Sequence, residues 1–140
     1  MALYIEAKVR FEKVMENGKV RKISEPYLVD ALSFTEAEAR ITEEVKPYIS
    51  GEFTVSAVKK TKIAEIFRDG KGGYWYMVKA NFISVNEKGV EKLSPSYFLV
   101  EASDFATAYE NFMDGMKGTM ADFTIAGITE TKIMDVFDAK

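Results

Sequence analysis

Two threonine–lysine pairs are the side chains of this sequence best suited to binding an anion. Thr61-Lys62 and Thr131-Lys132 are identical dipeptides, although the residues around them differ. A hydroxyl and an ammonium can together donate hydrogen bonds to an anionic group. The alternative role is structural, because threonine favours strands and lysine protects an exposed sheet edge. We therefore expect either a ligand-contacting surface or a guarded strand edge at these residues.

Four further polar residues occupy matching places in two segments of alternating polarity. Lys8 and Arg10 alternate with apolar residues in the first segment, and Lys79 and Asn81 do so in the second. Alternation with period two predicts half-buried strands with one exposed polar face. These residues extend the predicted ligand-contacting surface.

Trp75 is the one tryptophan of the chain and lies in the aromatic run Tyr74-Trp75-Tyr76. The alternation places Trp75, like Tyr4, on the face opposite the core, where a ring could stack on bases. Binding of single-stranded nucleic acid is therefore an alternative function. The ring could instead pack against the other half of the chain or a second chain. The net charge of −3 makes nucleic acid the less favoured partner.

The chain has no histidine and no cysteine, the residues most used for proton transfer and thiolate chemistry. Glu65 and Asp135 occupy matching positions, as do Glu52 and Asp122. A matched pair of acids could hold a divalent cation, so a carboxylate–metal hydrolase is a second alternative. Solvated acids at strand ends are the plainer interpretation. We expect no catalytic residue, no metal ligand and no cofactor.

The glycine-rich segment Gly70-Lys71-Gly72-Gly73 superficially resembles a phosphate-binding loop. It lacks the Gly-Lys-Ser/Thr spacing, and no helix is expected after it, so no helical N–H groups would face a phosphate. Clustered glycines are typical of turns. We expect a hairpin that joins two halves of the chain.

Those two halves resemble each other. Residues 53–67, FTVSAVKKTKIAEIF, return at 123–137 as FTIAGITETKIMDVF, with six of fifteen positions identical. The match continues upstream, where Leu28-Val29-Asp30-Ala31 answers Leu99-Val100-Glu101-Ala102. We predict a tandem duplication, with one repeat over 1–70 and the other over 71–140. Two such repeats usually pack about a pseudo-twofold axis into one compact domain.

Each repeat is predicted to be a β-β-α-β unit. The first has two strands joined by a turn at Glu16-Asn17-Gly18, then a helix that begins after Ser33 and ends near Lys46. Residues 53–67 are expected to form one long strand with a bulge near 59–61, or to end in a short helix. The expected fold class is α+β, with an antiparallel-rich sheet and two helices packed on one face.

Composition limits the class of protein. The chain has 140 residues, of which 47% are hydrophobic and 29% charged, as in an ordinary globular domain. The first residues carry charges inside their apolar stretch, which argues against a signal peptide or membrane span. The absence of cysteine fits a reducing compartment. We expect a cytoplasmic protein without membrane contact.

Three segments together resemble a catalogued family: LVDALSFTEAEARI (28–41), KIAEIF (62–67) and YWYMVKANF (74–82). The chain resembles domain of unknown function 4494, a family of phages and Bacteroidetes, over nearly its whole length. The resemblance implies a bacterial host cell or bacteriophage origin and a cytoplasmic setting. It implies no activity, ligand or functional residue.

We therefore predict a non-catalytic binding or regulatory protein, related to phages or prophages. Its expected ligand is a small anion, for example a nucleotide sequestered by an anti-defence protein, or alternatively a host protein. Apolar residues expected on the outer sheet face, Trp75, Met77 and Ile83, also favour a homodimer.

Overall fold

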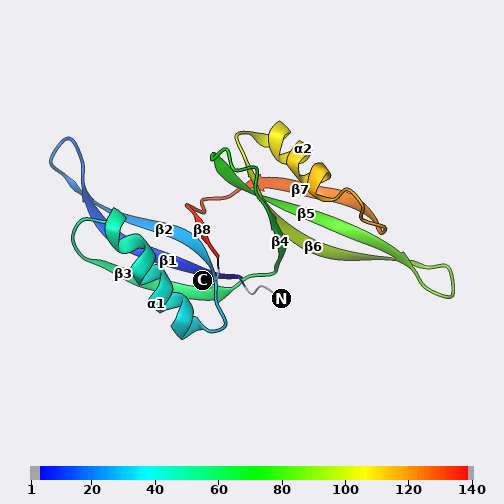
Figure 1. The fold of residues 1–140 in the computed structure, drawn as a ribbon, viewed down its shortest axis with the longest axis horizontal. Helices are drawn as coiled ribbons and strands as arrows, with labels where there is room; N and C mark the ends of the chain where they lie inside the picture. Colours follow the sequence, from blue (N-terminus) through cyan, green and yellow to red (C-terminus); the bar gives the residue numbers. More distant parts are fainter. Residues whose placement is uncertain (1–3, 139–140) are drawn as a thin grey trace. The chain divides into compact units, whose positions relative to one another are not determined.

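The fold was analysed in a computed structural model, which describes residues 4–138. It is an α+β protein with eight strands, two α-helices and one 3-10 turn, so the predicted fold class is confirmed (Figure 1). The elements in chain order are β1 (Tyr4–Val14), β2 (Val20–Asp30), α1 (Phe34–Val45), η1 (Lys46–Tyr48), β3 (Phe53–Lys60), β4 (Ile63–Phe67), β5 (Tyr74–Val85), β6 (Glu91–Ala102), α2 (Phe105–Gly115), β7 (Asp122–Glu130) and β8 (Val136–Phe137).

The strands form two four-stranded sheets, each with one helix on one face, and not the single sheet that we expected. The strand order is β3-β1-β2-β8 in one sheet and β4-β6-β5-β7 in the other. Read from the other edge, the second sheet has the same order of equivalent strands as the first. In each sheet the long hairpin and the strand after the helix are antiparallel, and the remaining strand is parallel to its neighbour.

The chain divides into two compact units that do not follow the predicted boundary between residues 70 and 71. The first unit contains the described residues up to Thr61 together with those from Lys132 onward, and the second contains Lys62–Thr131. The segment after each threonine–lysine boundary thus belongs to the sheet of the other half: β4 pairs with β6, and β8 pairs with β2. A local sequence pattern specifies that a strand forms but not which sheet it joins, so this exchange was not predicted.

The exchange also corrects the expectation of one long strand over residues 53–67. β3 ends at Lys60, and β4 begins at Ile63 in the other sheet. The bulge lies further back, where the register between β1 and β3 shifts between Lys8 and Val9. The register between β5 and β7 shifts at the matching place, between Lys79 and Ala80. The two units therefore share strand order and bulge position, while their origin by duplication stays a prediction.

Both helices begin at capping residues, Ser33, which the sequence predicts, and Asp104. The Ser33 hydroxyl accepts a hydrogen bond from the Glu36 N–H at 3.1 Å, and the Asp104 carboxylate accepts one from the Thr107 N–H at 2.8 Å. The Thr107 N–H also holds the pKa of Asp104 below its usual value. These bonds satisfy N–H groups that a helix start leaves without a partner. Each cap thereby sets where the helix leaves the preceding strand.

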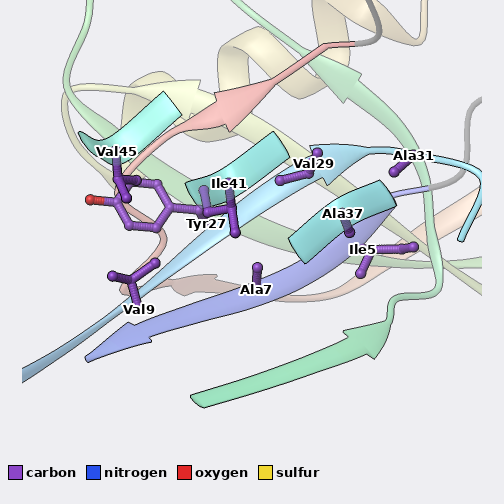
Figure 2. Packing of buried hydrophobic residues seen from close by; sticks show 9 residues of the cluster. All are labelled: Ile5, Ala7, Val9, Tyr27, Val29, Ala31, Ala37, Ile41 and Val45. Carbon is purple, nitrogen blue, oxygen red and sulfur yellow. The ribbon is translucent and has the colours of Figure 1, made fainter. Parts of the chain in front are cut away.

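The core of the first unit lies between α1 and the inner faces of its strands (Figure 2). Ile41 on α1 is fully buried, as are Ile5, Ala7 and Val9, which alternate along β1. The exchanged strand β8 adds Phe137, whose ring stacks on Tyr27 with centroids 5.9 Å apart. The apolar periods of strand and helix therefore meet in one layer, as the sequence predicts.

The core of the second unit is richer in aromatic rings. Phe112 of α2 is fully buried and packs edge-on against Phe98, with centroids 5.3 Å apart. Phe67, from the exchanged strand β4, stacks on Phe98 at 5.8 Å. A Cβ atom at Gly115 would lie 2.8 Å from the Phe67 ring, so α2 needs glycine there. The glycine that weakens the helix in isolation makes room for the exchanged strand.

Candidate functional site

The candidate site is a surface hollow of about 550 Å³ at the hairpin end of the first unit. We call it the outer hollow, because Arg10, Glu12 and Lys22 line it from the sheet face opposite α1. The β1–β2 register pairs Glu12 with Lys22 and places Arg10 one step along the same face. The loop that leads into β3 completes the lining with Ser50, Gly51 and Glu52.

Two cations in the outer hollow have no ion-pair partner among the residues that the structure describes. Within residues 4–138, neither Arg10 nor Lys22 forms an ion pair, whereas Lys59 on the same face pairs with Glu6 at 3.1 Å. Glu12 and Glu52 also line the hollow, so its charges are balanced. An anionic group could bind the guanidinium and the ammonium. The two carboxylates would disfavour a ligand with several negative charges.

The threonine–lysine pairs anchor strands. The Thr61 hydroxyl donates to the Tyr4 carbonyl at 2.8 Å, and the Thr131 hydroxyl donates to the Trp75 carbonyl at 2.7 Å. The backbone N–H groups of both threonines donate to the same two carbonyls. Each hydroxyl proton is therefore committed to the main chain at the point where the chain leaves its sheet. Lys62 and Lys132 are exposed next to these anchors, and they fall in different units.

The structure separates the other predicted contact residues between the units. Lys8 and Arg10 are exposed on the outer face of the first sheet, and Arg10 lines the outer hollow. Lys79 is exposed and Asn81 half-buried on the matching face of the second sheet. Arg10 is thus the predicted residue that lies in the outer hollow.

Of the two alternatives for Trp75, the structure supports a packed ring and not an exposed one, because only 5% of its surface is accessible. The Arg68 guanidinium lies 5.6 Å from the centre of the ring. Arg68 follows β4 directly, so the unexpected insertion of that strand beside β6 brings the cation over the tryptophan. A buried ring cannot stack on bases, which removes the aromatic group from the single-stranded nucleic-acid hypothesis.

The glycine-rich segment between β4 and β5 is a turn, but it is not the expected hairpin, because β4 pairs with β6. Its N–H groups already bind carboxylates of the chain: the Gly70 N–H donates to Glu101 and the Lys71 N–H donates to Asp69, both at 2.9 Å. The Lys71 N–H keeps the pKa of Asp69 low. Gly73 has φ of 117° and lies against the Ala102 carbonyl, which excludes a side chain there. Acidic side chains beside this turn oppose phosphate binding.

The acids of the hydrolase hypothesis do not form a cluster in the described part of the chain. Glu65 and Asp135 are exposed and belong to different units. Among residues 4–138 no group of three or more His, Cys, Asp or Glu side chains could hold a metal ion. Glu52 lines the outer hollow together with Glu12, while Asp122 stands at the start of β7.

A comparison of the two units shows which outer-hollow residues the sheet does not require. The pairing Glu12–Lys22 on the first hairpin corresponds to Ile83–Leu93 on the second, at the same distance from the turn. Asn81 holds the place of Arg10, opposite a threonine of the third strand in both sheets. The same sheet geometry therefore forms with uncharged residues at these places.

Sequence reasoning missed Lys22, Glu12 and Gly51 as parts of the site. A signal was present in the sequence. When the two halves are aligned, the charged residues Glu12 and Lys22 correspond to apolar residues of the second half. The residues that the two halves share include structural anchors such as Thr61 and Thr131. Gly51, with φ of 87°, turns the chain into β3 at the edge of the hollow.

The chain belongs to the family of proteins that contain Domain of unknown function 4494. A family model described as Domain of unknown function (DUF4494) matches residues 3–139, so the resemblance expected from the sequence is confirmed. No curated protein and no solved structure matches the chain. In the described residues no helix is long and apolar enough to cross a membrane.

Proposed function

We propose that this protein is a non-catalytic binding protein and that its ligand places an anionic group in the outer hollow. The observation that carries the proposal is the presence of Arg10 and Lys22, without ion-pair partners in the described chain, where the second sheet has Asn81 and Leu93. Since the second sheet forms with uncharged residues at these places, folding does not require the two cations, and they are available to bind an anion.

The nearby carboxylates narrow the class of ligand. Glu12 and Glu52 line the same hollow, so a ligand with a single anionic group, next to a neutral or cationic part, fits better than a polyphosphate. Within the nucleotides, a monophosphate is therefore preferred to a triphosphate. A role in the cytoplasm of a bacterial host, including sequestration of a nucleotide by a phage-related anti-defence protein, belongs to this proposal and rests on the family resemblance.

The proposal is tested by NMR titration of the ¹⁵N-labelled full chain with inorganic phosphate, AMP, ATP and glutamate. We expect saturable shifts of the Arg10, Lys22 and Gly51 amides, with AMP binding more tightly than ATP. Arg10→Asn combined with Lys22→Leu should abolish these shifts. The matched control, Lys79→Asn with Lys92→Leu, removes two cations from the second hairpin and should leave them unchanged. Shifts spread evenly over all lysines, or none at all, would refute an anion site in the hollow.

A further inference from the structure

The strand β1 has a free edge beside the outer hollow. β1 pairs with β2 over its whole length to Val14, but it pairs with β3 only as far as Phe11 (Figure 1). The hairpin therefore continues past the start of β3. Within residues 4–138 no strand lies beside Glu12–Val14 on that edge.

The backbone groups on this edge can be assigned from bonds further along β1. The carbonyls of Tyr4 and Lys8 face the β3 side, because Thr61 and Ser56 donate to them. Successive residues of a strand direct their N–H and C=O groups to alternate edges. Met15 bonds across the hairpin to Lys19, which fits the same alternation. Glu12 and Val14 therefore direct their N–H and C=O groups to the free edge.

A second hollow lies on the other side of the same edge. This inner hollow, of about 470 Å³, is lined on the helix side by Phe11, Ile23 and Ile49, and by Tyr48, whose side chain is 83% exposed. Glu12 and Val14 line both hollows. The free edge thus runs between a hollow with unpaired cations and a hollow with apolar and aromatic walls.

We infer that an extended peptide segment of a partner protein adds to β1 at Glu12–Val14, with an acidic side chain in the outer hollow and a neighbouring apolar side chain in the inner hollow. The inference rests on the proposed function, since the acidic side chain supplies the anionic group. An added strand satisfies the edge N–H and C=O groups. Its successive side chains point to opposite faces, so two adjacent residues reach the two hollows.

The side chains of the two hollows beside the free edge of β1 fit a peptide with one acidic and one apolar residue. In the outer hollow, Arg10 and Lys22 attract an acid, and Glu12 and Glu52 limit the segment to one. In the inner hollow, Glu25 accepts a hydrogen bond from the Tyr27 hydroxyl at 3.4 Å, and burial raises the pKa of Tyr27 to about 12, so this tyrosine stays neutral. Lys13 also lines the inner hollow and can face solvent along the peptide. Apart from Ser50 and the edge residue Glu12, the remaining wall is apolar or aromatic.

The test uses an array of short peptides with blocked ends and varied central residues, probed with the labelled full chain. We expect enrichment of an acidic residue directly beside an aliphatic or aromatic one. N-methylation at each of these two residues in turn should weaken binding by about tenfold or more at one residue and little at the other, because only one of two adjacent N–H groups faces β1. Replacing the acid by its amide should weaken binding similarly.

Two matched variants locate the binding edge. Val14→Pro removes the N–H that faces the free edge but no hydrogen bond to β2, so it should abolish peptide binding without unfolding the hairpin. Val85→Pro is the control at the matching position of β5. Peptides that bind equally well to the Val14→Pro protein, or that tolerate N-methylation at both of the two adjacent residues, overturn strand addition. If AMP or phosphate still binds at Arg10 while no peptide is enriched, the inference falls and the proposed function stands; if nothing binds, both fall.

Discussion

The hairpins of the two units share their strand order and bulge position and differ in the side chains of the outer face. In both, the third strand pairs with the first around a bulge at the same place, and the exchanged strand pairs in parallel with the second strand. At the end of the first hairpin the outer face carries Arg10, Glu12 and Lys22. The second hairpin carries Asn81, Ile83 and Leu93 there.

This difference separates what the fold needs from what a ligand would need. Anchors that both units share, such as Thr61 and Thr131, bond to the main chain. Residues that the units do not share, Arg10, Glu12 and Lys22, line the outer hollow. Its two cations form no ion pair in the described chain. Position-matched substitutions in the two units can therefore test each role, because each unit is the control for the other.

The largest effect is expected in the two cores. Phe112→Ala should lower the free energy of unfolding by about 3–5 kcal/mol, because it removes a fully buried ring and leaves a cavity. Ile41→Ala at the matching position of α1 should cost about 2–5 kcal/mol for the same reason. Urea denaturation measures both values. A loss below about 1 kcal/mol at either site would show that the unit does not depend on its described core.

The next largest effect on stability is expected for alanine at one position of α2, and it should be absent at the matching position of α1. Gly115→Ala should destabilise the protein by about 1–3 kcal/mol, although alanine is the better helix former, because the new methyl group meets the Phe67 ring. Phe67 cannot move easily, since it packs against Phe98 and Phe112. Glu44→Ala at the matching position should change the free energy by less than about 0.5 kcal/mol, because its ion pair with Arg40 joins neighbouring turns of one helix. A stabilised Gly115→Ala protein would contradict the placement of β4.

The threonine anchors should give smaller and equal effects. Thr61→Val and Thr131→Val each remove one side-chain hydrogen bond to a carbonyl and keep the shape of the side chain. We expect a loss of about 1 kcal/mol for each in urea denaturation. If either valine variant instead lost ligand binding at unchanged stability, that threonine would be a ligand contact.

The helix caps should give an effect no larger than that of the threonine anchors, and at Asp104 the effect depends on pH. Ser33→Ala should cost about 1 kcal/mol at any pH, because a hydroxyl does not titrate in this range. The folded-state pKa of Asp104 is lowered by the Thr107 N–H, so its cap contributes fully above the pKa of the unfolded chain. That contribution is lost as the pH falls through the folded-state pKa. The Asp104→Ala protein should therefore differ from the parent at neutral pH and match it in strong acid; a constant difference would contradict the cap.

Local elements could be predicted from the sequence, whereas their partners could not. The alternation of Ile5, Ala7 and Val9 is a property of neighbouring residues, so the strand and its inner face were predicted correctly. The destination of Ile63–Phe67 depends on pairing with distant β6, which no local period encodes. The contact of Arg68 with the Trp75 ring could not be predicted for the same reason. Of the two cations of the outer hollow, the sequence predicted only Arg10 as a contact residue. Lys22 lies on a different strand, and its position beside Arg10 depends on the register of the hairpin.

The most direct test of the account is the stability of a triple variant that gives the first hairpin the outer-face residues of the second: Arg10→Asn, Glu12→Ile and Lys22→Leu. We expect this variant to have a free energy of unfolding within about 0.5 kcal/mol of the parent in urea denaturation and to lose binding of AMP and acidic peptides. A loss of stability above about 2 kcal/mol would show that these charges hold the sheet together, and the assignment of the outer hollow as a binding site would be wrong.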